Sequence, residues 1–198
     1  IADSVRLSEA DFVARLRETA LTVPPTAIEF FDAHALNLLR GQKASNPAFA
    51  AIPEMPPRFH TAIYVEFQDA DDDRISESVM VLSDLMTACG GSEDATWIAT
   101  DSRELERFKK FRHAVPEAVN LLIDQRRKTE PGLTKLGTDM SVPDADLREI
   151  LALYTQTLAE TGLEYVIFGH IGNNHVHVNI IPRTLAEYDA GKALYLTW

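Results

Sequence analysis

The chain alternates between two spacings of apolar residues, one typical of α-helices and the other typical of β-strands. Helical spacing between polar, proline or glycine ends predicts helices at 33–41, 74–89, 102–125 and 143–162 and from 184 onward. Alternating or continuously apolar runs predict strands at 26–32, 59–68, 95–100, 164–171 and 175–182, and a strand or extended loop at 132–142. The segment LSEADFVARLRETA, near the start of the chain, predicts a peripheral helix.

The order of these elements predicts the fold class. Strands alternate with helices, but the last two strands follow one another directly, which indicates an antiparallel pair. We therefore expect an α+β fold, in which a mostly antiparallel sheet is covered by helices on one face, as in doubled ferredoxin-like units. Residues 27–198 form one domain in this interpretation, and residues 1–26 form a peripheral helical segment. Pro116 predicts a kink or break in the long helix 102–125.

The last two strands carry three histidines in the sequence FGHIGNNHVHVNIIPR. A two-residue turn at Asn173 and Asn174 would place His170 directly opposite His177, because asparagine tolerates the left-handed backbone of such turns. Side chains alternate along a strand, so His175 would lie on the same face, nearer the turn. Opposed residues have Cβ atoms about 5 Å apart, which lets two imidazoles bind one metal ion at about 2.0–2.1 Å, as in zinc sites.

The spacing therefore predicts His170 and His177 as a pair of metal ligands. His175 could be a third ligand, an outer group or a substrate contact. The simpler alternative is that all three are half-buried polar residues on an open sheet face, without chemistry.

Composition and charge exclude some classes of binding partner. The net charge of −11 argues against non-specific binding to nucleic acids or anionic membranes, whose phosphates would be repelled. Cys89 is the only cysteine, so an internal disulfide is excluded and a reducing compartment is favoured. No run of about 18 apolar residues is present to span a bilayer. We therefore expect a cytoplasmic protein, or one that associates with a membrane only at its periphery.

The histidine hairpin also resembles a known signature. GHIGNNHVHVNI is similar to the pattern Gly-His-x-Gly-Asp-Gly-Asn-x-His of the FAD-linked oxidase family, which includes D-lactate dehydrogenases, glycolate oxidase and D-2-hydroxyglutarate dehydrogenase. The residues that match it are Gly169, His170, Gly172 and His177, and those that replace its Asp, Gly and Asn are Asn173, Asn174 and His175. In metal-dependent members the outer histidines bind a divalent ion, so the resemblance assigns zinc, manganese or iron to His170 and His177. It also places His175 toward the flavin and the substrate.

Other segments resemble the same family. FKKFRHAVPEAVN (108–120) is similar to the segment whose arginine binds the substrate carboxylate, and this arginine corresponds to Arg112. TKLGTDMSVP (134–143) is similar to an Asp-x-Ser-Val-Pro segment with a lysine upstream, which corresponds to Lys135. AIEFFDAHAL (27–36) resembles the opening strand and helix of the family's C-terminal domain. Without the resemblance, Arg112 would be interpreted as a solvated helix residue and Lys135 as a surface residue.

The resemblance implies an FAD-dependent 2-hydroxyacid dehydrogenase or oxidase of D-lactate or glycolate type, with this chain as its substrate (cap) domain. The family binds FAD on a separate N-terminal domain, and a Ser-x-Glu-His-Gly motif supplies a further metal ligand; neither occurs in this sequence. We therefore expect the isolated chain to be inactive. In the intact enzyme, hydride would pass from the substrate to the flavin while His175 or His177 accepts the hydroxyl proton. Electrons would then pass to oxygen, a quinone or a partner protein.

Two alternative functions stay open. HVHVNIIPR resembles the strand of histidine-triad nucleotide hydrolases, in which the middle histidine attacks a phosphate. His177 would be that nucleophile, although Asn179 stands in place of the third histidine. The other alternative is a metal-binding module with no chemistry of its own.

Overall fold

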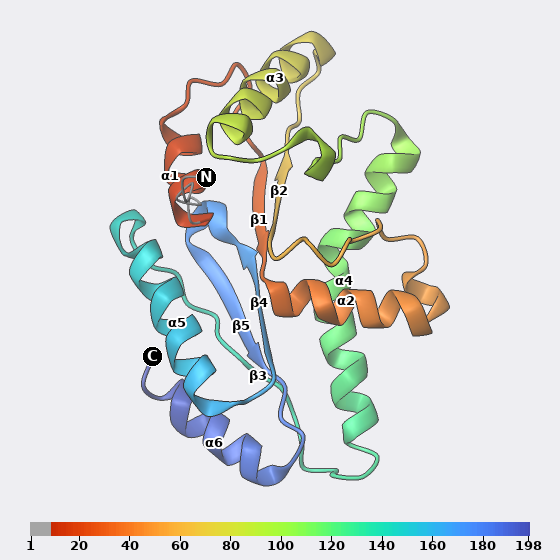
Figure 1. The fold of residues 1–198 in the computed structure, drawn as a ribbon, viewed down its shortest axis with the longest axis vertical. Coiled ribbons are helices and arrows are strands. Elements are labelled where there is room, and N and C mark those ends of the chain that lie inside the picture. Colours follow the sequence, from red (N-terminus) through yellow and green to blue (C-terminus); the bar gives the residue numbers. More distant parts are fainter. Residues whose placement is uncertain (1–8) are drawn as a thin grey trace.

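The computed structural model describes residues 9–198, apart from the side chain of Glu93. A five-stranded sheet of order β2-β1-β4-β5-β3 forms its centre, and every neighbouring pair of strands is antiparallel (Figure 1). The strands are β1 (Ala27–Phe31), β2 (Ala62–Glu66), β3 (Leu136–Gly137), β4 (Tyr165–His170) and β5 (His175–Ile180). The α-helices of this part are α1 (Glu9–Glu18), α2 (Ala33–Ser45), α3 (Asp72–Ala88), α4 (Ser102–Arg126), α5 (Leu147–Thr161) and α6 (Leu185–Tyr195). The predicted α+β class with an antiparallel sheet is confirmed.

Helices cover one face of the sheet, as predicted. On this face, Ile167, Val176 and Val178 pack against α5, and α1 and α6 extend the same layer (Figure 1). Alternating side chains on the opposite face, Val166 and Phe168, pack against α2 and α4, which form a second helical layer that the sequence did not indicate. The histidines of β4 and β5 belong to this second face, beyond Phe168.

Local sequence explains where most elements begin and end. Asp32 caps α2 by accepting a hydrogen bond from the backbone N–H of Ala35 at 2.7 Å. Gly162 ends α5 in the left-handed conformation, with φ of 66°. The predicted helix near the N-terminus is present as α1, although residues 1–8 lie outside the described part of the chain. The division into residues 1–26 and 27–198 stays a prediction.

Two predictions for the middle of the chain need correction. The helix α4 is continuous through Pro116, so a break there is wrong and a kink stays a prediction. The apolar run 95–100 is not a strand and has no place in the sheet; its Trp97 instead contacts the rings of Phe59, Phe108 and Phe111. Residues 9–198 contain no helix that is both long enough and sufficiently apolar to span a lipid bilayer. The expected cytoplasmic location stays a prediction.

The cap of α2 makes a pH-dependent contribution to stability. Burial raises the pKa of Asp32 from 3.8 to about 7, so the folded state disfavours its carboxylate. The wild type therefore loses stability as pH rises from 3.8 to about 7, and the loss is complete above that pH. Asparagine caps equally well without a charge, so Asp32→Asn should be stabilising by about 2 kcal/mol more at pH 8 than at pH 5. Urea denaturation of both proteins at pH 5 and pH 8 measures this effect. The same difference in free energy of unfolding at the two pH values would contradict the raised pKa of Asp32.

Candidate functional site

The hairpin that joins β4 and β5 has a longer connection than predicted. A 3₁₀ turn at Ile171–Asn173 and the left-handed Asn174, with φ of 53°, separate the two strands. His170 therefore lies opposite His175, and Phe168 lies opposite His177. The predicted pairing of His170 with His177 is wrong, because the turn uses one left-handed residue and a 3₁₀ segment instead of a two-residue loop.

All three histidines nevertheless lie on one face, as predicted. The ring centroids are 5.5 Å apart for His170 and His177, 5.8 Å for His170 and His175, and 4.6 Å for His175 and His177. Moving the register by two residues keeps every side chain on its face, because the period of a strand is two. The structure thus brings the histidines together with a different set of facing pairs.

Hydrogen bonds determine which nitrogen of two of these rings carries the proton. Nδ1 of His177 lies 3.1 Å from the carbonyl oxygen of Thr138, and a carbonyl oxygen can only accept, so Nδ1 donates. Nδ1 of His170 lies 2.8 and 3.0 Å from the carboxylate oxygens of Glu29 and donates to them. In the neutral form of each ring, Nε2 then carries the lone pair. Histidines that bind metal ions are held in this way, with the second nitrogen donating to a carboxylate or carbonyl.

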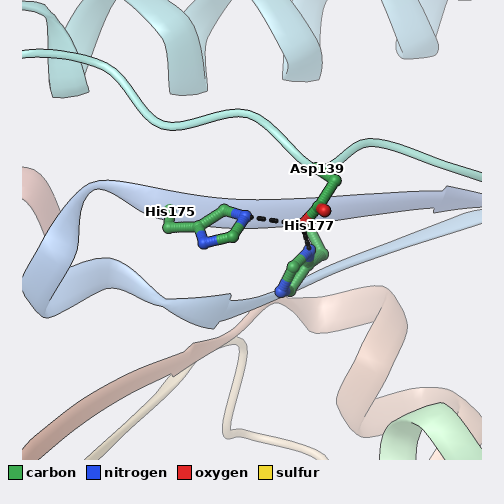
Figure 2. A group of neighbouring side chains, drawn as sticks. All are labelled: Asp139, His175 and His177. Carbon is green, nitrogen blue, oxygen red and sulfur yellow. Dashed lines mark hydrogen bonds and ion pairs between the residues drawn. The ribbon is translucent and has the colours of Figure 1, made fainter.

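His175 has a different partner. Its Nε2 lies 2.8 Å from Oδ1 of Asp139, which follows β3 and is 83% exposed (Figure 2). The same oxygen lies 3.9 Å from Nδ1 of His177, so one ligand atom from each of Asp139, His175 and His177 falls within 4.8 Å of the others. An ion bound by all three through these atoms would displace the hydrogen bond between His177 and Thr138. This competition distinguishes two candidate metal sites, one at His170 and His177 and one at Asp139.

Arg112 lies on the same side of the sheet as the histidines. Its Nη2 is 2.5 Å from Oε1 of Glu29, and its Nη1 is 3.2 Å from Oε2 of Glu66. Tyr64 donates its hydroxyl proton to the same Glu66 oxygen at 2.8 Å, and burial raises the pKa of that hydroxyl well above its usual range. Glu29 therefore touches both Arg112 and His170, which joins the predicted carboxylate-binding residue to the predicted metal ligand.

Lys135 lies farther along the sheet from the hairpin turn than the three histidines do. Leu136 pairs with Ile180 and Gly137 with Asn179, so Lys135 falls opposite Ile181, on the histidine face but farther along β5 from the hairpin turn. In the described part of the chain, it makes no hydrogen bond or ion pair. The structure therefore brings His170, His175, His177 and Arg112 together and leaves Lys135 at the margin of the group.

Arg17 stabilises the hairpin turn, and it was not identified from the sequence. Its Nη2 donates to the carbonyl of Gly172 at 2.8 Å and to Oδ1 of Asn174 at 2.7 Å, and its Nη1 pairs with Asp144 at 2.9 Å. Asn174 in turn donates to Asp144 at 2.6 Å. The helix α1 thus holds the hairpin turn that sets the positions of the histidines. Asp139 was also missed, although it lies in the quoted TKLGTDMSVP segment, because long-range contacts bring that segment to the hairpin: the pairing of β3 with β5 and the bridge between Ser141 and His175.

Comparison with known proteins identifies the family of the chain. The chain matches the family described as "FAD linked oxidases, C-terminal domain" over residues 8–198. It is also similar to a protein of Danio rerio named "Probable D-lactate dehydrogenase, mitochondrial", with 27% identity over 159 residues. That match covers 80% of this chain but only 28% of the zebrafish protein. The family match spans nearly the whole sequence, and the chain belongs to the FAD linked oxidases, whose C-terminal domain it represents.

Proposed function

We propose that this chain is the substrate domain of an FAD-dependent 2-hydroxyacid dehydrogenase or oxidase, of D-lactate or glycolate type. The family match and the name of the zebrafish relative support the reaction class. The observation that carries the proposal is the pair of donated Nδ1 protons on His170 and His177. They leave two Nε2 lone pairs on neighbouring rings, which is the donor set that a divalent cation such as zinc, manganese or iron prefers.

In this proposal, His170 and His177 hold the cation through Nε2. A bound divalent cation would lower the pKa of the substrate hydroxyl and fix its orientation. Thr138 and Glu29 keep the two rings in the required tautomer. Asp139 stays outside this site, because an ion bound to Asp139 and to Nδ1 of His177 would displace the hydrogen bond between His177 and Thr138.

His175 is the base that accepts the hydroxyl proton. Asp139 accepts the Nε2 proton of His175, so Nδ1 carries the lone pair. The carboxylate would then stabilise the imidazolium that forms, as an acidic partner does for a histidine base in other enzymes. His177 does not fit this role once its Nε2 holds the cation. The same position of His175 would bring it near the flavin, which supplies the hydride chemistry from an FAD-binding domain of the same polypeptide.

Arg112 binds the substrate carboxylate. Glu66 is 30% exposed and contacts Arg112 at 3.2 Å, whereas Glu29 is almost fully buried and contacts it at 2.5 Å. An incoming carboxylate would therefore replace Glu66 on Nη1 and leave Glu29 in place. Such pairing of a guanidinium with a carboxylate fixes both position and angle. Lys135 is proposed as a second, more distant cation for the substrate, and the electron acceptor as oxygen, a quinone or a protein.

A spectroscopic experiment tests this function against its alternatives. The full-length protein is mixed anaerobically with D-lactate, glycolate or D-2-hydroxyglutarate, and the flavin absorbance is followed. Bleaching by one of these acids, but not by its enantiomer or by the corresponding non-hydroxylated acid, is the expected result. Release of AMP from a nucleotidyl substrate without bleaching would instead support a histidine-triad hydrolase with His177 as nucleophile. Metal binding with neither reaction would leave a non-catalytic module.

A further inference from the structure

Glu29 is a buried carboxylate in the middle of β1. It is 3% exposed, and it lies between one guanidinium and one imidazole. Burying a carboxylate is costly unless it is paired and hydrogen-bonded. Glu29 meets both conditions, because Oε1 accepts from Arg112 at 2.5 Å and both oxygens face Nδ1 of His170.

The sheet itself puts Glu29 in this position. Phe30 pairs with Gly169 in the antiparallel ladder between β1 and β4, so the preceding residue of β1 falls opposite the following residue of β4, which is His170. Their side chains share the face that carries Arg112. The contact is therefore fixed by strand register and does not depend on a loop.

We propose that Glu29 is a positioning residue that sets the tautomer and ring orientation of His170 and fixes that ring relative to Arg112. This inference rests on the proposed function, in which His170 holds the cation and Arg112 holds the substrate carboxylate. A single buried carboxylate then determines the geometry between the hydroxyl end and the carboxylate end of a small hydroxy acid.

Glu66 serves as the matched comparison. It contacts Arg112 at 3.2 Å and Tyr64 at 2.8 Å, and its hydrogen bonds and ion pairs do not include His170. It lies at the end of β2 and is partly exposed. A residue that only balances the charge of Arg112 would behave like Glu66, whereas a positioning residue would also control His170.

Glu29→Gln separates these two roles. The guanidinium of Arg112 has only donors, so the amide oxygen of the glutamine turns toward it and the NH₂ group faces Nδ1 of His170. An NH₂ group donates, and Nδ1 must then accept, which moves the ring proton to Nε2. In this variant, Nε2 of His170 should therefore carry a proton and have no lone pair to bind a metal ion.

The first readout is the tautomer of His170 in the metal-free protein. The purified protein is labelled with ¹⁵N-histidine, treated with a chelator and observed by long-range ¹H–¹⁵N correlation at about pH 8.5, where imidazoles are neutral. His170 is assigned from the His170→Gln spectrum. We expect a proton on Nδ1 in the wild type and in Glu66→Gln, and a proton on Nε2 in Glu29→Gln. A wild-type ring protonated on Nε2, or a folded Glu29→Gln protein that keeps Nδ1–H, would overturn the inference.

The second readout is affinity for Zn²⁺, measured by competition with a chelating dye. Loss of such a supporting hydrogen bond lowers metal affinity by about 10–100-fold, and this loss is expected for Glu29→Gln. Glu66→Gln should bind Zn²⁺ within about twofold of the wild type and change only the KM of the hydroxy acid. Equal Zn²⁺ affinity in wild type and Glu29→Gln would also overturn the inference.

A conservative variant covers the case in which Glu29→Gln does not fold. Glu29→Asp keeps a carboxylate, which still accepts from both neighbours, so His170 should retain Nδ1–H; a proton on Nε2 in this variant would overturn the inference. Failure of the proposed function would look different. The tautomer would invert as expected in Glu29→Gln, while no 2-hydroxy acid bleached the flavin of the wild type.

Discussion

Replacing His177 with glutamine in the full-length protein is expected to lower kcat for hydroxy-acid oxidation by about 10³-fold and to remove the bound cation. In the proposed site, His177 provides one of the two Nε2 donors, and its Nδ1 contacts the carbonyl oxygen of Thr138. A glutamine side chain is of similar length but offers a weakly basic amide oxygen in place of the imidazole nitrogen. Steady-state turnover and the metal content of the purified protein measure the two effects.

His60→Gln is the control for this variant. His60 is exposed and lies outside the histidine cluster, so the same substitution there should leave turnover and metal content within about twofold of the wild type. A His177→Gln protein that keeps both its cation and its turnover would show that the hairpin is not the catalytic site.

Gly169→Ala is expected to destabilise the folded protein by about 3–5 kcal/mol, which combines a strained backbone with an overpacked side chain. Gly169 has φ of 122°, a conformation that side chains with a Cβ rarely adopt. An added Cβ would lie 2.6 Å from Cδ2 of His177 and 3.3 Å from the carbonyl oxygen of His175. The glycine next to His170 is therefore required because the His177 ring packs directly against its backbone.

Gly41→Ala is the matched control for Gly169→Ala. Gly41 lies inside α2, and an added Cβ would have no neighbour within 4 Å. Alanine in a helix interior stabilises by about 0.5–1 kcal/mol relative to glycine. Urea denaturation should thus move the two variants in opposite directions. A Gly169→Ala protein within about 1 kcal/mol of the wild type would contradict the close packing of the two strands around His177.

The shared face of the three histidines could be predicted from sequence because it depends only on the alternation of a strand. The sequence could not predict which residues of β4 and β5 lie opposite one another, because this depends on how many residues the turn uses. Asn173 and Asn174 have the composition of a two-residue turn, but only Asn174 is left-handed, and Arg17 and Asp144 hold its side chain. Those two partners come from distant segments, so no local pattern indicates them.

The same limit applies to the carboxylates of the site. Glu29 and Asp139 come from β1 and from the segment after β3, and each reaches a histidine only through the strand order β2-β1-β4-β5-β3. The apolar run around Trp97 shows the opposite error, because its composition is typical of a strand while its aromatic side chain packs against three rings. Burial also differs from the pattern in this run, because Trp97 is 39% exposed and Ile98 is 55% exposed.

The position of a bound Zn²⁺ ion decides between a metal site at His170 and His177 and one at Asp139. Crystals of the protein are soaked in Zn²⁺, and the ion is located by anomalous scattering at the zinc edge. We expect one peak at about 2.0–2.1 Å from Nε2 of both His170 and His177, with the bond between His177 and Thr138 intact. A peak between Asp139 and His175 that leaves His170 without zinc, or no peak at the hairpin at saturating zinc, would contradict it.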